Sequence, residues 1–121
     1  MYTFSFEKLD VWKNSRELVL KIYEITNSFP TNEIYGITTQ LKRSTSSITT
    51  NIAEGTSRST KKDTAHFLTI SYSSAMETLN HLILCKDLNY ITEDDYLMCR
   101  NQLEKICNQI NSLKKYYLSK S

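Results

Sequence analysis

The sequence predicts an all-α protein that folds as an up-down-up-down antiparallel four-helix bundle. Apolar residues recur at alternating spacings of three and four in four separate stretches, which is the pattern of one helix face. The connections between these stretches are short, so consecutive helices are expected to run antiparallel. With two Gly and one Pro in 121 residues, the chain has little room for hairpins or long loops. We therefore expect a single domain, residues 1–121, with helices over about 9–28, 33–54, 61–88 and 93–118.

The first helix, over 9–28, ends because the residue before Pro30 is driven out of the helical region. Leu18 and Tyr23 broaden its apolar stripe. Phe4 and Phe6 precede the helix and are expected to pack against the bundle. The stripe itself consists of Trp12, Ser15, Val19, Ile22, Thr26 and Phe29.

The second helix, over 33–54, has a polar stripe. Thr31 or Asn32 can cap its start, and Glu33 suits the first turn, where the helix dipole favours an acid. We expect Gly55 to end this helix in the left-handed conformation. The stripe contains Ile34, Ile37, Leu41, Ser44, Ile48 and Asn51. Two polar members of six indicate specific contacts as well as bulk packing.

The third and fourth helices each begin with a predicted cap. Thr60 with Asp63, and Thr92 with Asp95, resemble capping boxes in which Asp replaces the usual Glu or Gln. The third stripe is Ala65, Leu68, Tyr72, Ala75, Leu79 and Leu82. The fourth is the most regular and consists of Tyr96, Cys99, Leu103, Ile106, Ile110, Leu113 and Tyr117.

The composition favours a cytoplasmic protein without a cofactor. No apolar run approaches the roughly 18 residues of a membrane span, and the N-terminus has no features of a signal peptide. Three cysteines without C-x-x-C spacing, Cys85, Cys99 and Cys107, argue against a disulfide framework or a zinc site. Small buried side chains are the favoured interpretation, and a weak thiol or metal role is the alternative.

Charge is unevenly distributed along the chain, although the net charge is only +2. Residues 40–62 carry a local charge of +4, because Glu54 is their only acid against five basic residues. The five are Lys42, Arg43, Arg58, Lys61 and Lys62. In a bundle, the end with the second connection should be basic, at +3, and the opposite end acidic, at −3.

Helix dipoles explain only part of this polarity. They favour acids such as Asp94 at a helix start and lysines such as Lys115 at a helix end. They do not explain Lys61 and Lys62 at a helix start, or two basic residues in mid-helix. For these, binding to phosphates or an acidic partner and a plain solvated face remain equally open.

No catalytic motif and no convincing metal site is found. Phosphate-binding loops and dinucleotide fingerprints are missing, and the chain has only two His. His81 and Cys85 stand at i and i+4 and could share a metal, but two ligands make a weak site, and an ordinary helix flank is favoured. We expect no enzymatic activity.

Motifs along nearly the whole chain match a known family. They are Leu9-x-Val11-Trp12, Phe29-Pro30-x-x-Glu33-x-Tyr35-Gly36, Gln40-x-Lys42-Arg43, Ser47-Ile48-x-x-Asn51-Ile52-Ala53-Glu54-Gly55, Ser74-x-x-Glu77 and Leu88-x-Tyr90-Ile91. In these motifs the chain resembles the S23, or 23S rRNA-intervening-sequence, four-helix-bundle proteins, which include the accessory variability proteins of diversity-generating retroelements. Here Lys42 stands where the family usually has Arg, and Ser44 where it often has Ala.

The resemblance implies a homo-oligomer, most often a pentamer, with a basic surface for RNA or DNA and sometimes a reverse transcriptase as partner. We accordingly expect a non-enzymatic accessory protein. The expected nucleic-acid-binding residues are Lys42, Arg43, Arg58, Lys61 and Lys62. The expected assembly or structural residues are Gln40, Ser47, Asn51, Glu54 and Gly55. The alternative is a protein–protein scaffold or adaptor, for example for a reverse transcriptase, that does not bind nucleic acid itself.

Overall fold

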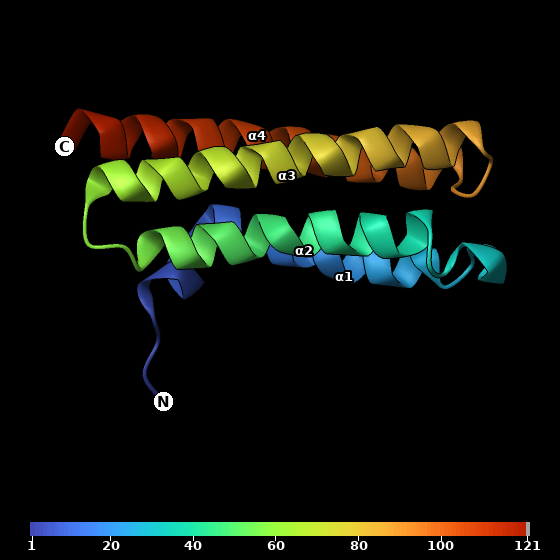
Figure 1. The fold of residues 1–121 in the computed structure, drawn as a ribbon, viewed down its shortest axis with the longest axis horizontal. Coiled ribbons are helices and arrows are strands. Elements are labelled where there is room, and N and C mark those ends of the chain that lie inside the picture. Colours follow the sequence, from blue (N-terminus) through green and yellow to red (C-terminus); the bar gives the residue numbers. More distant parts are fainter. Residues whose placement is uncertain (121) are drawn as a thin grey trace.

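The computed structural model describes residues 1–120 as a bundle of four long helices. These are α1 (Asp10–Thr26), α2 (Ile37–Thr56), α3 (Lys61–Asp87) and α4 (Glu93–Lys120), with short 3-10 turns η1 (Ser5–Lys8) and η2 (Thr31–Glu33). No strand occurs among these residues. Figure 1 shows consecutive helices running in opposite directions, so the predicted all-α, antiparallel four-helix bundle is confirmed.

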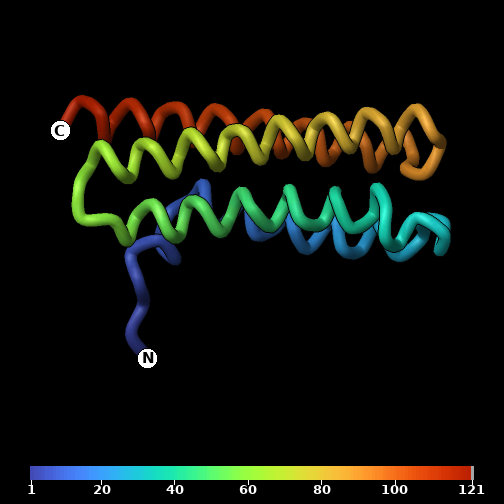
Figure 2. Tube along the Cα trace, in the orientation of Figure 1, coloured from blue at the N-terminus to red at the C-terminus, as the bar shows by residue number. Residues whose placement is uncertain are grey.

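The four helices close into a ring of neighbours. The chain trace shows this arrangement (Figure 2): α1 packs on α2 and α4, and α3 packs on α2 and α4. The α2–α3 connection (residues 57–60), η1 and the last turn of α4 gather at one end, hereafter the loop end. The connections of residues 27–36 and 88–92 form the opposite end, hereafter the far end (Figure 1).

The core is aliphatic and runs along the bundle axis. Its fully buried large side chains are Leu18, Ile22, Leu41, Ile48, Ile52, Leu68, Leu82, Leu103, Ile106 and Ile110. The predicted stripe of α4 is confirmed, since Leu113 and Tyr117 also pack on this core. In α1, however, Tyr23 is 46% exposed and Ile25 is buried instead.

The start of α2 differs from the prediction of a helix from residue 33. Thr31–Glu33 forms η2, and α2 begins at Ile37 with Gly36 as N-cap. Neither Thr31 nor Asn32 caps α2. Glu33 instead accepts a hydrogen bond from Tyr90 Oη at 2.8 Å, which holds η2 on the α3–α4 connection and raises the pKa of Tyr90. Ile34 therefore lies outside the helix and is 48% exposed.

The expectation that Gly55 ends α2 in the left-handed conformation is wrong. The helix continues through Gly55 to Thr56, and no glycine has a positive φ. Gly55 is buried against α3, where a Cβ atom would lie 2.8 Å from Cβ of Phe67. A glycine is required here because the two helices approach closely, not because the backbone turns.

Two predicted caps are present, at the starts of α3 and α4. Thr60 Oγ1 accepts a hydrogen bond from Asp63 N, and Thr92 Oγ1 accepts one from Asp95 N, both at 3.1 Å. The N-terminal aromatic residues behave differently from each other. Phe6 packs edge-on against Trp12, with ring centroids 5.0 Å apart, but Phe4 is 60% exposed and does not join the bundle.

The cysteines are buried free thiols, as their favoured interpretation predicts. Burial raises the pKa of Cys85 and of Cys99 to about 11, and it also raises the pKa of Cys107. Among residues 1–120, no helix combines the length and apolar character needed to cross a lipid bilayer.

Candidate nucleic-acid interface

A row of small polar side chains joins α2 to α3. Ser71 Oγ donates to the carbonyl oxygen of Ile48 at 2.9 Å, Ser74 Oγ donates to Ser47 Oγ at 2.8 Å, and Thr78 Oγ1 lies 3.0 Å from Ser44 Oγ. At the loop end, Thr64 Oγ1 donates to the carbonyl oxygen of Gly55 at 2.8 Å. We call this row the hydroxyl seam. Small side chains let the two backbones approach, and each buried hydroxyl has a partner.

Sequence reasoning missed the α3 side of this seam. The predicted stripe of α3 runs through Tyr72 and Leu79, which are half-buried. Beyond Thr64, the buried polar residues of α3 form a second stripe, namely Ser71, Ser74, Thr78 and His81. Their spacing is also three, four and three, so a search for polar periodicity could have found them.

A polar pocket lies at the outer edge of the seam. It is lined by Gln40, Arg43, Ser44 and Ser47 from α2 and by Glu77 from α3. The structure thus brings three predicted site residues together with Glu77. Arg43 is exposed and forms no ion pair with any residue in the range 1–120. Its guanidinium is free to contact a ligand.

His81 lies next to this pocket on α3. Its Nε2 atom is 3.3 Å from Glu77 Oε2, and the residue is buried. Its Nδ1 atom is buried without a hydrogen-bond partner in the described chain. No group of three or more His, Cys, Asp or Glu side chains that could hold a metal is found within residues 1–120.

The structure separates the predicted basic pair. Lys42 is half-buried on the α1 side of α2, where its Nζ atom lies 4.8 Å from the ring centroid of Tyr23. Arg43 points to the α2–α3 pocket instead. Consecutive helix residues diverge by about 100°, so these two cations cannot form one contact surface.

Arg58 is engaged within its own chain. Its Nε atom donates to Asp63 Oδ2 at 2.7 Å, and its guanidinium carbon lies 5.3 Å from the ring centroid of Phe67. Both partners belong to the first turns of α3, so Arg58 fastens the connecting loop to that helix. This residue has less freedom to bind phosphate than its position in the sequence indicates.

The predicted assembly residues divide into two groups. Asn51 Nδ2 donates to the carbonyl oxygen and to Oγ of Ser47, at 2.9 and 3.0 Å, and Gly55 is buried on α3. Ser47 and Gly55 therefore contact α3, through Ser74 and Phe67, whereas Asn51 is hydrogen-bonded within α2. Gln40 and Glu54 are exposed and remain available for contacts with another molecule.

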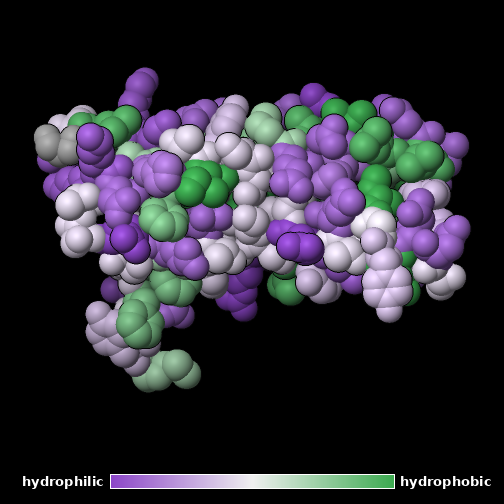
Figure 3. All heavy atoms as spheres, viewed as in Figure 1, coloured by the Kyte–Doolittle hydropathy of each residue, from purple (hydrophilic) through white to green (hydrophobic). Residues whose placement is uncertain are grey.

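The loop end gathers cations from α3 and α4. Lys61 and Lys62 open α3, are exposed, and form no ion pair with any other described residue. The final turns of α4 reach the same end (Figure 1), and they carry Lys114, Lys115 and Lys120. Figure 3 shows the face over α2 and α3 as mostly hydrophilic.

Cations near the far end are neutralised instead. Lys21 lies 3.9 Å from Glu24 and 4.0 Å from Asp95, and Lys86 lies 3.8 Å from Glu93. Lys61 and Lys62, in contrast, have no acidic partner among the described residues, and they lie at a helix start, where the helix dipole disfavours cations.

Comparison with known proteins agrees with the fold and its motifs. The family model described as 23S rRNA-intervening sequence protein matches residues 7–112. The chain belongs to this family. A solved structure of a protein of unknown function from the S23 ribosomal protein family of Bacteroides thetaiotaomicron is similar, with a TM-score of 0.78 and 27% identity. The match covers 87% of this chain and 98% of that one.

No curated protein matches this member of the 23S rRNA-intervening sequence protein family. Neither the family description nor that of the solved structure names an enzymatic activity. The family assignment covers α1, α2 and α3 and most of α4, so it includes both the hydroxyl seam and the start of α3.

Proposed function

We propose that this family member is a non-enzymatic, homo-oligomeric accessory protein that binds RNA or DNA through its loop end. The observation that carries the proposal is the pair of exposed, unpaired lysines at the start of α3, beside the lysines that end α4. A helix start favours anions, so two lysines there raise the free energy of the helix unless a phosphate or another anion lies nearby.

The acidic side chains near Lys61 and Lys62 also favour the loop end as the binding surface. Asp63 is engaged by Arg58, and Glu7 accepts a hydrogen bond from the backbone N–H of Phe4 at 2.8 Å. Two of the acidic side chains at the loop end are thereby held in local contacts and compensate Lys61 and Lys62 less. Arg43, in the α2–α3 pocket, would extend the contact along the bundle.

The experiment is a salt titration of binding to a structured RNA, with the Lys61→Ala/Lys62→Ala variant beside the parent. Loss of two phosphate contacts should lower affinity and reduce the slope of log K against log salt by about 1.4 to 1.8. The matched control is Lys86→Ala/Lys105→Ala, which removes the same charge elsewhere and should leave the slope unchanged. Absence of binding at low salt, or equal slopes for all three proteins, would refute the proposal.

A scaffold function is the second candidate, and one observation favours it. Tyr35 is 98% exposed at the far end, beside Ile34 at 48%, close to the acids of that end. An exposed aromatic side chain flanked by acids suits a basic protein partner, for which a reverse transcriptase is one candidate. A partner that is recovered with the parent after nuclease treatment, but not with Tyr35→Ser, would favour this function.

The proposed assembly is a pentamer, as the resemblance to the family implies, and its proposed location is the cytoplasm, as the composition favours. Light scattering tests its stoichiometry directly. A mass near 14.1 kDa, that of one chain, would exclude any oligomer.

A further inference from the structure

An N-terminal arm, residues 1–4, projects from the bundle with its large apolar side chains in solvent. Met1 is fully exposed, Tyr2 is 75% exposed and Phe4 is 60% exposed. Figures 1 and 3 show the arm leaving the bundle and carrying apolar groups away from it. Scattered exposed apolar residues are ordinary, but three within four residues on a projecting segment indicate a binding element.

The base of the arm is fixed rather than free. The backbone N–H of Phe4 donates to Glu7 Oε2 at 2.8 Å, and the backbone N–H of Glu7 donates to the carbonyl oxygen of Phe4 at 3.1 Å. Phe6 packs on Trp12. These contacts set the direction in which the arm leaves η1.

The arm has the alternation of an extended binding segment. Phe4 is extended, with φ −75° and ψ 156°. Side chains two residues apart point to the same side of an extended chain, and the rings of Tyr2 and Phe4 pack edge-on with centroids 4.9 Å apart. Together they form one apolar ridge, with Thr3 between them in the sequence.

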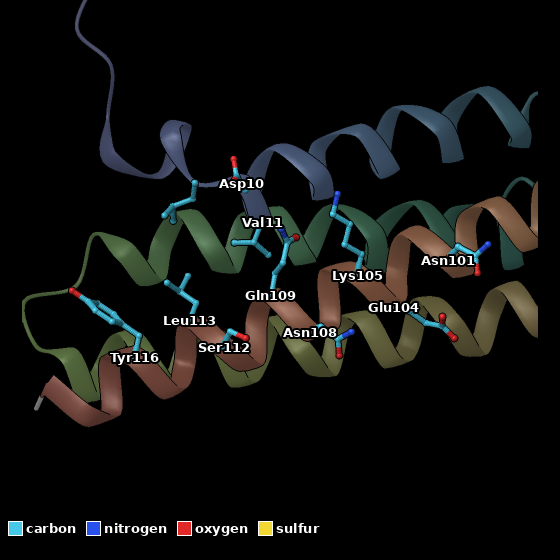
Figure 4. A pocket seen from close by; sticks show the side chains of 11 residues that line it. Asp10, Val11, Asn101, Glu104, Lys105, Asn108, Gln109, Ser112, Leu113 and Tyr116 are labelled. Carbon is cyan, nitrogen blue, oxygen red and sulfur yellow. The ribbon is translucent and has the colours of Figure 1, made fainter.

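A groove of about 700 Å³ lies between the start of α1 and the outer face of α4. Its apolar lining includes Leu9, Val11, Leu113 and Tyr116, and its polar lining includes Asn108 and Ser112 (Figure 4). Tyr116 is 54% exposed. In the same view the arm of the chain runs away from α4, so it does not enter its own groove.

We propose that this groove receives the N-terminal arm of a second copy of the chain. Tyr2 and Phe4 would pack on Leu113 and Tyr116. An extended backbone needs external hydrogen-bond partners, and the Asn108 and Ser112 side chains, which form no hydrogen bonds with other described residues, can provide them. The inference rests on the proposed assembly into oligomers but is independent of nucleic-acid binding.

Photo-cross-linking tests the exchange of arms directly. An unlabelled chain with p-benzoyl-phenylalanine in place of Phe4 is mixed with an unmodified ¹⁵N-labelled chain, the subunits are exchanged, and the mixture is irradiated and digested. Mass spectrometry should find the arm joined to ¹⁵N-labelled peptides from residues 101–116 of α4. The control carries the photoreactive residue in place of Tyr35, which is even more exposed than Phe4 but lies at the far end, and should not label these peptides.

A second measurement distinguishes this interface from assembly in general. Tyr2→Ser/Phe4→Ser should weaken self-association at least about tenfold in sedimentation equilibrium, since it removes two aromatic anchors. Its helical content should be unchanged, because neither side chain contacts the core. Oligomers whose arms never cross-link to labelled α4 peptides would overturn the inference while leaving the proposed assembly intact. A purely monomeric protein would overturn both.

Discussion

Gly55 and Phe67 lie so close that a Cβ atom at position 55 would be 2.8 Å from Cβ of Phe67 and 3.4 Å from the carbonyl oxygen of Thr64. The contact joins the last turn of α2 to the first turns of α3. It sets the separation of these helices at the loop end, next to the hydrogen bond between Thr64 and Gly55.

Gly55→Ala should therefore destabilise the protein although alanine is the better helix former. Overpacking costs about 1–3 kcal/mol, whereas replacing glycine in a helix gains up to about 1 kcal/mol. We expect a net loss of about 1 kcal/mol or more in urea unfolding. Ala53→Gly is the control, because it makes the reverse exchange at a half-buried position of the same helix and should lower stability by up to about 1 kcal/mol through helix propensity alone. A Gly55→Ala protein as stable as the parent would show that the helices can move apart freely.

Thr78→Val should show how much the hydroxyl seam contributes to the free energy of unfolding. The two side chains have the same shape, but valine leaves Ser44 Oγ without its contact to Thr78 in a fully buried position. Loss of a buried hydrogen bond costs about 1 to 2 kcal/mol. The midpoint of urea unfolding should fall with an unchanged m-value. Thr78 Oγ1 also lies 2.9 Å from the carbonyl oxygen of Ser74, four residues earlier. Thr50→Val, at an exposed position whose hydroxyl bonds in the same way to Ser46, should change stability far less.

The buried thiols predict a loss of stability in alkaline solution. Burial raises the pKa of Cys99 to about 11, against 9.0 for an ordinary thiol. Between these values the unfolded chain has released the thiol proton while the folded chain retains it, so the free energy of unfolding falls as pH rises. Below pH 9 this contribution is fully present. Cys99→Ala should lose less stability than the parent between pH 8 and pH 10, by about 1 kcal/mol. Equal losses would mean that Cys99 ionises freely in the folded state.

Arg58→Ala should act mainly on the loop rather than on nucleic acid. Its ion pair with Asp63 and its contact with Phe67 are partly exposed, so each contributes at most about 1 kcal/mol. A double-mutant cycle with Asp63→Asn should give a coupling energy of that order. RNA affinity should fall less than for Lys61→Ala/Lys62→Ala. The reverse order of affinities would make Arg58 the principal phosphate contact.

The bundle and most of its core could be predicted from the sequence because aliphatic periodicity reports burial directly. Leu103 and Ile106 stand in a regular stripe, and both are buried. Aliphatic periodicity could not identify the buried polar residues. Ser71 and Thr78 are as buried as these residues, yet serine and threonine are usually exposed, so their positions carry no clear signal unless their partners on α2 are known.

The candidate site was harder to predict than the fold. Adjacent cations in a sequence diverge on a helix, and only the packing shows that Lys42 lies on Tyr23 while Arg43 lines the α2–α3 pocket. Similarly, the loop sequence indicates a free cation at Arg58, but the cap at Thr60 places Asp63 within reach of its guanidinium. A count of charges in the sequence gives the number of cations in a segment. It does not show which of them already form ion pairs or aromatic contacts in the folded chain.

The position of the last turns of α4 at the loop end (Figure 1) has a practical consequence for any assay of this protein. A purification tag or fluorophore fused after α4 would be attached at the same end as Lys61 and Lys62 and would obstruct ligand access there, whereas an N-terminal fusion would be attached to the projecting arm (Figure 1). Binding should therefore be measured on cleaved protein. A probe placed in the far-end connection of residues 27–36 would stand a full bundle length from the surface under test.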